Sequence, residues 1–310
     1  FRSLRAVGCR CVALALPYGR EWLLWDLAIL NAGLICVPIA PFFTRQQREH
    51  LLRSAGVDTV LGMADDSAEL LAQGFAATSL GWQRAPMGVG IPAGTAKITF
   101  TSGTTGTPVG VVYNHETAMR IHWAFSQYYL GHNRGLMMHA VPLFYAGGIM
   151  RTVSHLLDGS PTYIMPPISS AQEIAEQFLA LEARQAFVVP PQLFGLLELS
   201  RGRTEPMFPA MTSLGGAGGT FPAETILRAY RELSHALRIS YGASFAGNIS
   251  SLSGEDILRR PETVGRPNTH GLVRITDFEG NELPRGESGL ITVRNATMGD
   301  GIIGQSRELS

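Results

Sequence analysis

Short apolar segments alternate with amphipathic segments along most of this chain, and no other feature constrains its fold more. The apolar runs at residues 11–16 and 35–39 have the length of buried strands, while residues 21–31 between them repeat apolar side chains at helical spacing. Strands that alternate with helices favour an α/β fold, in which helices cover a largely parallel sheet. The pattern predicts further strands at residues 59–63, 97–101, 111–113, 137–143, 161–165, 186–189 and 238–241, and further helices at 44–55 and 222–237.

Two stretches depart from this alternation. Residues 74–94 lose periodicity and are rich in glycine and proline, which indicates a surface connection. After residue 263, short segments at 273–277 and 289–294 are joined by charged turns, a pattern that predicts antiparallel hairpins. We therefore expect an α/β core over residues 1–263 and the start of a β-rich subdomain over residues 264–310.

Composition excludes several function classes. Hydrophobic residues make up 45% of the chain, and 25 basic residues balance 25 acidic ones, so the chain is neither disordered nor charged for nucleic acid or anionic membranes. Three cysteines are too few for a disulfide framework, and no cysteine or histidine pairing has zinc-finger spacing, so we expect no metal site of that kind. No segment is a convincing membrane span. A reduced cytoplasm is the expected setting.

The densest polar motif lies between two predicted strands, at residues 101–110 with the sequence TSGTTGTPVG. Its three glycines expose backbone N–H groups and its five hydroxyl side chains add donors, a composition typical of loops that bind phosphate oxygens. The Gly-Lys-Ser/Thr ending of a Walker loop is absent. A solvated hairpin with no ligand is the alternative interpretation.

The segment around this loop, ITFTSGTTGTPVGVVYNH at residues 98–115, resembles the phosphate-loop signature of the adenylate-forming (AMP-binding) superfamily. That superfamily includes acyl-CoA synthetases, luciferases and the adenylation domains of nonribosomal peptide synthetases. Further segments are similar to family motifs in the same order and spacing. They are NAGLICVPI at 31–39, PLFYAGG at 142–148, GGA at 215–217, YGAS at 241–244, GRP at 265–267 and GESG at 286–289. The resemblance therefore covers nearly the whole chain.

The resemblance implies a two-lobed α/β core of mostly parallel sheets in an αβαβα layering, followed by part of a small antiparallel β-barrel. The family's mobile C-terminal domain would be absent from this chain. The implied reaction is attack by the carboxylate of a small acid on the α-phosphate of ATP, which gives an acyl-adenylate and pyrophosphate. Mg²⁺ normally helps to neutralise the phosphate charge. CoA or a carrier-protein thiol would be a partner through the missing domain.

The same resemblance implies roles for individual residues. Those expected to bind ATP or AMP are Thr101, Ser102, Gly103, Thr104, Thr105 and Gly106 at the phosphates, and Gly216, Ala217, Gly218, Tyr241, Gly242 and Ala243 at adenine. Catalytic roles fall on Thr104, Thr105 and Ser244, and the acyl pocket would include Phe144, Tyr145, Gly147 and Gly148. No charged residue stands out in these pocket segments, so the sequence favours an apolar or aromatic acyl group.

Three positions depart from the family pattern. The loop lysine falls at Val109, the Mg²⁺-binding glutamate falls at Phe245, and the histidine of the pocket segment falls at Tyr145. Losing one charge-assisted contact to a phosphate costs on the order of 2–3 kcal/mol. Lys97 is the one lysine of the chain, but its Cα precedes that of Thr101 by about 13 Å of strand, so we do not expect it to replace the lost cation.

Two other patterns are weaker. Residues 242–246, GASFA, fall one glycine short of the nucleophile elbow of α/β-hydrolases, and no clear helix follows them. Most of the eight histidines are scattered, and we interpret His122, His132, His139, His155 and His235 as surface residues or as core residues with hydrogen-bond partners.

Two function classes follow from the sequence. The first is ATP-dependent activation of a carboxylic acid, as in an acyl-CoA synthetase-like ligase. The second is a degenerate AMP-binding-fold protein that binds a ligand, acts as a scaffold or regulator, or performs altered chemistry in the same cleft. Val109 and Phe245 favour the second class, and the intact Gly/Thr loop favours the first.

Overall fold

The fold was analysed in a computed structural model that describes residues 8–63, 66–101, 107–126, 135–166 and 169–304. The chain divides into two compact units. The first comprises residues 1–119, 142–150 and 299–310, and the second comprises residues 120–141 and 151–298. Each unit has its own sheet and its own core.

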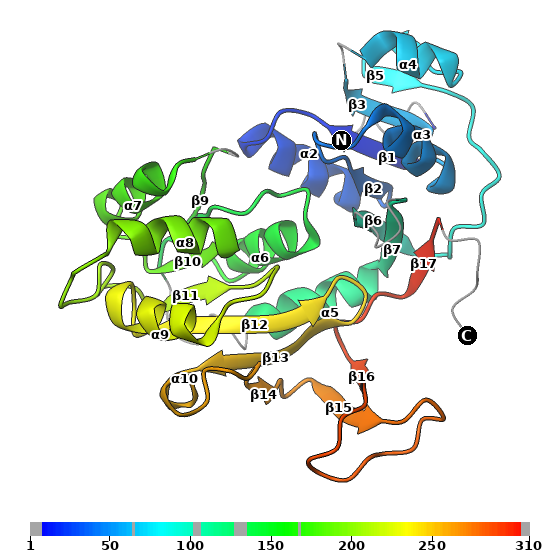
Figure 1. Ribbon diagram of the computed structural model, residues 1–310. Coiled ribbons are helices and arrows are strands. Elements are labelled where there is room, and N and C mark those ends of the chain that lie inside the picture. Colours follow the sequence, from blue (N-terminus) through cyan, green and yellow to red (C-terminus); the bar gives the residue numbers. More distant parts are fainter. Residues whose placement is uncertain (1–7, 64–65, 102–106, 127–134, 167–168, 305–310) are drawn as a thin grey trace. The chain divides into compact units, whose positions relative to one another are not determined.

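The sheet of the first unit is mixed, with parallel pairing at its centre (Figure 1). In spatial order its strands are β17 (Gly301–Ile303), β7 (Val109–Asn114), β6 (Thr95–Thr101), β2 (Ile35–Pro38), β1 (Cys11–Ala15), β3 (Thr59–Gly62), β5 (Gly81–Gln83) and β4 (Ala76–Thr78). The predicted strands are confirmed, but the expected surface connection at 74–94 is partly wrong. It contains the β4–β5 hairpin, which extends the sheet next to β3.

Helices α2 (Arg20–Asn31), α3 (Arg45–Ser54) and α4 (Ser67–Ala72) follow strands of this sheet. Helix α3 begins with a capping box, in which Thr44 accepts a hydrogen bond from the Gln47 backbone and the Gln47 side chain accepts one from Thr44. The buried apolar side chains of α3, Leu51 and Leu52, belong to the same core as strand residues such as Val60.

A buried ion pair lies inside the first unit. Lys97 on β6 and Asp26 on α2 are both almost fully buried, and the Lys97 Nζ donates to Asp26 Oδ1. The Cys36 thiol donates to the same oxygen at 3.0 Å. Burial alone lowers the pKa of Lys97, but the interactions with Asp26 and Cys36 together outweigh burial, so the pKa lies above its usual value. Lys97 is therefore a charged group that stabilises the fold from inside.

The sheet of the second unit is parallel except at one edge. Its spatial order is β14 (Arg266–Pro267), β13 (Gly247–Ser253), β12 (Leu237–Ala243), β11 (Ser213–Gly216), β10 (Gln185–Val188), β8 (Met137–His139) and β9 (Thr162–Ile164). Figure 1 shows α7 (Ala171–Ala180), α8 (Pro190–Leu199) and α9 (Ala223–Glu232) along one face of this sheet. The short helix α10 (Glu255–Arg259) follows β13.

Successive residues of strands β8 and β10 pack on opposite faces of their sheet. Met138, Ala186 and Val188 pack in the large core with residues of α7, α8 and α9. The alternate residues face the other way, since side chains alternate along a strand, and Met137 packs with Phe187 in a separate small cluster. Helices α5 (His115–Phe125) and α6 (Ala146–Leu157) each contribute residues to both units.

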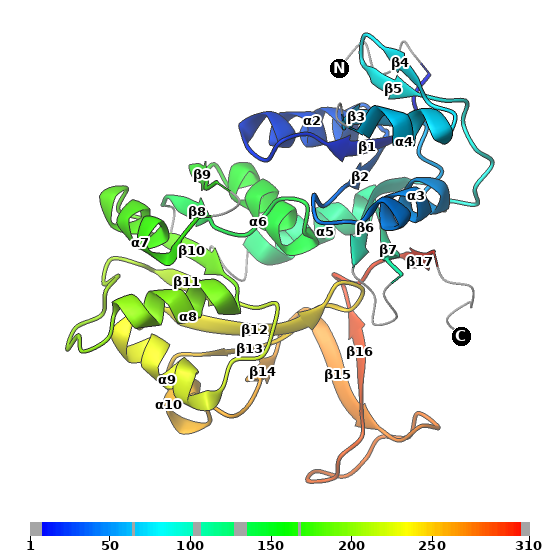
Figure 2. The same cartoon turned by 45° about the horizontal axis from the view of Figure 1, so that its top comes forward.

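The predicted hairpin after residue 263 is present. Strands β15 (Gly271–Thr276) and β16 (Leu290–Asn295) pair antiparallel along their full lengths (Figure 2). They form a two-stranded sheet, and the described residues close no barrel. No helix in the described parts of the chain is long and apolar enough to cross a membrane.

Candidate active site

The carboxyl ends of the parallel strands in the second unit carry the predicted adenine-binding residues. Gly216 ends β11, and Ala217 and Gly218 follow it. A side chain could not be added at Gly216 without crowding, because a Cβ there would lie 3.0 Å from Ile239 and 3.3 Å from Phe221. Gly218 adopts φ +88°, a left-handed conformation that favours glycine. The result is a low, backbone-lined edge that suits a flat base.

The neighbouring strand β12 brings Tyr241 to the same edge. β12 continues through Gly242 and Ala243 before Ser244, and its pairing with β13 shifts between Tyr241 and Gly242. Tyr241 is 38% exposed, so its ring is available to a ligand. A Cβ at Gly242 would lie 2.3 Å from the carbonyl oxygen of Gly247, so the hairpin requires glycine there. The structure thus brings the two predicted adenine-binding segments together at one sheet edge.

Part of the predicted phosphate loop can be placed in the first unit. Thr101 ends β6 and pairs with Val109, the first residue of β7. Ser102, Gly103, Thr104, Thr105 and Gly106 lie outside the described residues. Val109, at the position that the resemblance gives to the family's loop lysine, therefore begins the strand that pairs with β6.

Lys97 does not compensate for Val109. Its ammonium is buried in the pair with Asp26, and its pKa is raised by that carboxylate. Moving it to the loop would leave Asp26 as an uncompensated buried charge, which is strongly unfavourable. The ion pair with Asp26 agrees with the expectation that Lys97 does not replace the lost cation at the phosphate loop.

The predicted pocket residues Phe144 and Tyr145 belong to an aromatic cluster in the first unit. The Phe144 ring lies 4.7 Å from that of Tyr145 and 5.7 Å from that of Phe42, and the Phe42 and Tyr145 rings are 6.1 Å apart. Partial burial raises the pKa of the Tyr145 phenol, which keeps the group neutral. Gly147 has open space where a side chain would begin, whereas Gly148 is buried. The sequence did not point to Phe42, which follows β2 by four residues.

The donor set does not fit a protein-held Mg²⁺. Phe245 is half-buried and supplies no oxygen ligand. No group of three or more His, Cys, Asp or Glu side chains within the described ranges could hold a metal ion. We therefore derive no step through a protein-bound metal.

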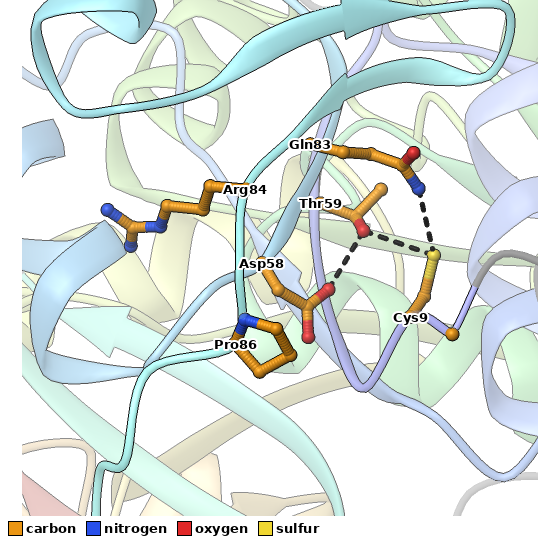
Figure 3. A pocket seen from close by; sticks show the side chains of 7 residues that line it. Cys9, Asp58, Thr59, Gln83, Arg84 and Pro86 are labelled. Carbon is orange, nitrogen blue, oxygen red and sulfur yellow. Dashed lines mark hydrogen bonds between the residues drawn. The ribbon is translucent and has the colours of Figure 1, made fainter.

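A small pocket of about 210 Å³ lies at the opposite end of the first unit's strands (Figure 3). Cys9 precedes β1 and Asp58 precedes β3, so this pocket is at the amino ends of the parallel strands. The Cys9 sulfur accepts hydrogen bonds from Thr59 and Gln83, and the Asp58 carboxylate accepts from the backbone N–H groups of Arg10 and Cys11. These contacts fix the strand starts, and ligands of parallel sheets bind at the other end.

Comparison with known proteins decides the family. The sequence profile described as "AMP-binding enzyme" matches residues 2–303. The chain belongs to the AMP-binding enzyme family. It is 25% identical to the AMB antimetabolite synthetase AmbE of Pseudomonas aeruginosa over 99% of the chain and 15% of AmbE. It therefore spans a small fraction of this relative's length.

Solved structures of two synthetases share the fold. The amide bond synthetase McbA from Marinactinospora thermotolerans superposes with a TM-score of 0.80 at 23% identity, over 97% of this chain and 65% of McbA. The O-succinylbenzoate coenzyme A synthetase MenE from Bacillus subtilis, in complex with ATP and magnesium ion, gives 0.80 at 18% identity, over 97% and 64%. The chain thus spans just under two thirds of these structures.

Two sequence interpretations are settled by the local structure. Residues 242–246 lead from β12 into the antiparallel strand β13 rather than into a helix, so they do not form a nucleophile elbow.

The interpretation of His139 as a core residue with hydrogen-bond partners is wrong. His139 is fully buried, and neither ring nitrogen has a partner among the described residues. Strand periodicity could have shown that His139 faces away from the main core, but not that its nitrogens are unsatisfied.

Proposed function

We propose that this AMP-binding family member activates a carboxylic acid with ATP, forming an acyl-adenylate and pyrophosphate. The observation that carries the proposal is the edge formed by Gly216–Gly218 and Tyr241 at the carboxyl ends of β11 and β12. Its glycines leave no side chain over the backbone, and a Tyr ring is exposed beside them. Such an edge binds a planar base by stacking and backbone contacts.

The remaining roles follow from the same proposal. Thr101 and the loop after it would donate hydrogen bonds to the β- and γ-phosphates, and Ser244 would donate to the α-phosphate. Thr104 and Thr105 would stabilise the charge that develops as pyrophosphate leaves. Phe144, Tyr145, Gly147 and Gly148 would line the entrance for the acid. A thiol of CoA or of a carrier protein is the proposed acceptor, because related proteins include peptide synthetases such as tyrocidine synthase 3.

A second candidate is a binding or regulatory module with no adenylation activity. Specific observations favour it: Val109 replaces a cation, Phe245 replaces an anionic metal ligand, and the one lysine of the chain is buried in an ion pair. Such a protein would still bind AMP at the glycine edge. The two candidates therefore differ in chemistry rather than in nucleotide binding.

Acid-dependent exchange of labelled pyrophosphate into ATP separates them. We expect measurable exchange by the wild-type chain with at least one carboxylic acid. Val109→Lys should increase the rate roughly thirtyfold, which corresponds to about 2 kcal/mol from one charge-assisted contact in the transition state. Val109→Met has similar length without charge and should not increase it. Phe245→Glu, alone and combined with Val109→Lys, tests the metal-ligand position.

The outcomes are distinct. Exchange that appears only in the Val109→Lys/Phe245→Glu double variant would reject adenylation by the natural chain and support the binding module. Absence of AMP binding in calorimetry would reject both candidates.

A further inference from the structure

A histidine on helix α3 contacts the end of the predicted phosphate loop within the first unit. The Nε2 atom of His50 lies 3.0 Å from the carbonyl oxygen of Pro108, a residue 58 positions further along the chain. A carbonyl oxygen only accepts hydrogen bonds, so the ring donates through an Nε2–H group. The hydroxyl oxygen of Ser54 lies farther from the same nitrogen, at 3.5 Å. The contact with Pro108 therefore assigns the ring proton to Nε2.

Pro108 depends on its carbonyl oxygen for backbone hydrogen bonding, because proline has no N–H group. The residue is buried and lies one position before β7. The described pairing of β7 with β6 begins at Val109, and its pairing with β17 begins at Gly110, so Pro108 belongs to neither ladder (Figure 2). A buried carbonyl oxygen outside a ladder needs another donor. His50 is that donor.

Helix α3 and strand β17 hold the histidine in place. Leu51, next to His50 on α3, is fully buried in the core of the first unit, and Ile303 of β17 packs against the same core. Gly304 follows β17 with φ +84°, and a Cβ there would lie 3.0 Å from His50 Nε2 and 3.4 Å from the Pro108 oxygen. The end of β17 thus packs directly beside the contact, which leaves the ring little room to move.

A fixed loop end matters because Val109 carries no charge. A lysine at this position would attract phosphates by its charge, whereas the loop of this chain offers backbone N–H groups and hydroxyl donors. Such donors bind most tightly when their backbone is ordered before the ligand arrives, because ordering then costs no binding free energy. The hydrogen bond from His50 orders the backbone at Pro108.

We propose that His50 is a positioning residue for ATP binding. Its hydrogen bond to Pro108 holds the end of the phosphate loop in the arrangement that receives the β- and γ-phosphates, and His50 itself touches neither nucleotide nor acid. The inference rests on the proposed function and adds a residue of α3 that lies outside every motif of the resemblance. Loss of the bond should weaken binding of ATP and spare binding of AMP, which lacks those two phosphates.

Calorimetric titration with ATP and with AMP, in the absence of acid, tests the inference without turnover. His50→Leu removes the donor and should weaken ATP binding about tenfold, the loss expected for one buried hydrogen bond, and change AMP binding by less than about twofold. His50→Gln should recover most of the ATP affinity, because its amide Nε2 donor is as many bonds from the Cα as the histidine Nε2. His235→Leu, which replaces an exposed histidine, should change neither affinity.

Equal weakening of ATP and AMP binding in His50→Leu would overturn the inference, since that pattern shows a general effect on the fold. So would unchanged ATP binding, or a loss that His50→Gln does not reduce. If His50→Leu does not fold, nuclear magnetic resonance of the wild-type chain decides. The Nε2–H resonance of His50, assigned through His50→Gln, should shift on addition of ATP and not of AMP. A ring protonated on Nδ1 alone, or a resonance that ATP leaves unshifted, would contradict the positioning role.

The proposed function fails separately. If His50→Leu weakens ATP binding alone and no acid supports pyrophosphate exchange, adenylation is rejected and the role of His50 in nucleotide binding stands. If exchange occurs and its KM for ATP is the same in His50→Leu as in the wild type, adenylation stands and the positioning role is rejected. Absence of ATP binding by the wild-type chain would reject both.

Discussion

The two units bury polar clusters in different ways. In the first unit, the charges of Lys97 and Asp26 cancel, and Cys36 donates to the same carboxylate. In the second, the Arg151 guanidinium is stacked on aromatic rings next to a neutral His139 whose nitrogens have no partner among the described residues. In the first cluster the opposite charges offset each other, although Asp26 Oδ2 has no hydrogen-bond partner among the described residues, whereas in the second cluster both ring nitrogens of a buried histidine lack one. We therefore expect loss of the first pair to destabilise the fold and loss of the His139 ring to stabilise it.

Breaking the buried pair of Lys97 and Asp26 should have the largest effect on stability. Lys97→Met leaves Asp26 as an unpaired buried charge and should lower the free energy of unfolding by about 3–5 kcal/mol in urea denaturation. Adding Asp26→Leu should recover most of that loss, because both charges are then gone. Arg259→Met breaks an exposed ion pair with Glu255 and should change stability by less than about 1 kcal/mol. If Lys97→Met changes the free energy of unfolding by as little as Arg259→Met does, the buried pair does not stabilise the fold.

Replacing His139 by an apolar residue should instead increase stability. His139→Leu removes two unsatisfied buried nitrogens and should raise the free energy of unfolding by about 1–2 kcal/mol in the absence of ligand. His115→Leu, at an exposed position, should stay within about 0.5 kcal/mol of the wild type. Destabilisation by His139→Leu would indicate that the ring has a partner.

The sequence predicted the fold better than it predicted the difference between the two buried polar clusters. Apolar periodicity placed most parallel strands of both sheets, since burial dictates composition along a strand. It missed β4 and β5, because short strands with exposed residues such as Ala76 and Ala77 carry little hydrophobic signal. It also missed the antiparallel strands β13, β14 and β17. Gly216, Gly218 and Gly242 were found through motif order, and their crowded or left-handed positions give the physical reason for glycine.

The polar clusters could not be read from the sequence. Lys97 and Asp26 are 71 residues apart, and only the packing of α2 against the sheet brings them together. Arg151 and His139 likewise look like ordinary surface and core residues until α6 lies against β8 and β10. Long-range juxtaposition decides whether a polar side chain is solvated, or buried with or without a partner.

Acid should weaken the second cluster selectively. The folded pKa of His139 is about 3, well below the usual value for histidine, so the unfolded chain binds a proton that the folded chain does not. Stability should therefore fall as the pH drops below about 6.5, at up to roughly 1.4 kcal/mol per pH unit for this residue. Burial also lowers the pKa of His155, which adds to the slope. Lys97 has a raised pKa, so its ammonium remains charged throughout this range.

Denaturation curves of the wild type and His139→Leu between pH 7 and pH 5 measure that effect. The variant should lose less stability on acidification. Parallel pH dependence in the two proteins would contradict a neutral, buried His139.

The most direct test of the central claim follows an oxygen atom. If a carboxylate of the acid attacks the α-phosphate of ATP, one of its oxygens becomes the bridge of the acyl-adenylate. When that mixed anhydride is hydrolysed at its carbonyl carbon, the bridging oxygen stays with AMP. The chain, incubated with ATP, Mg²⁺ and an acid labelled with oxygen-18 in its carboxylates, should release AMP that contains one labelled oxygen in mass spectrometry. AMP without label, or no AMP with any acid, would contradict acid activation by this chain.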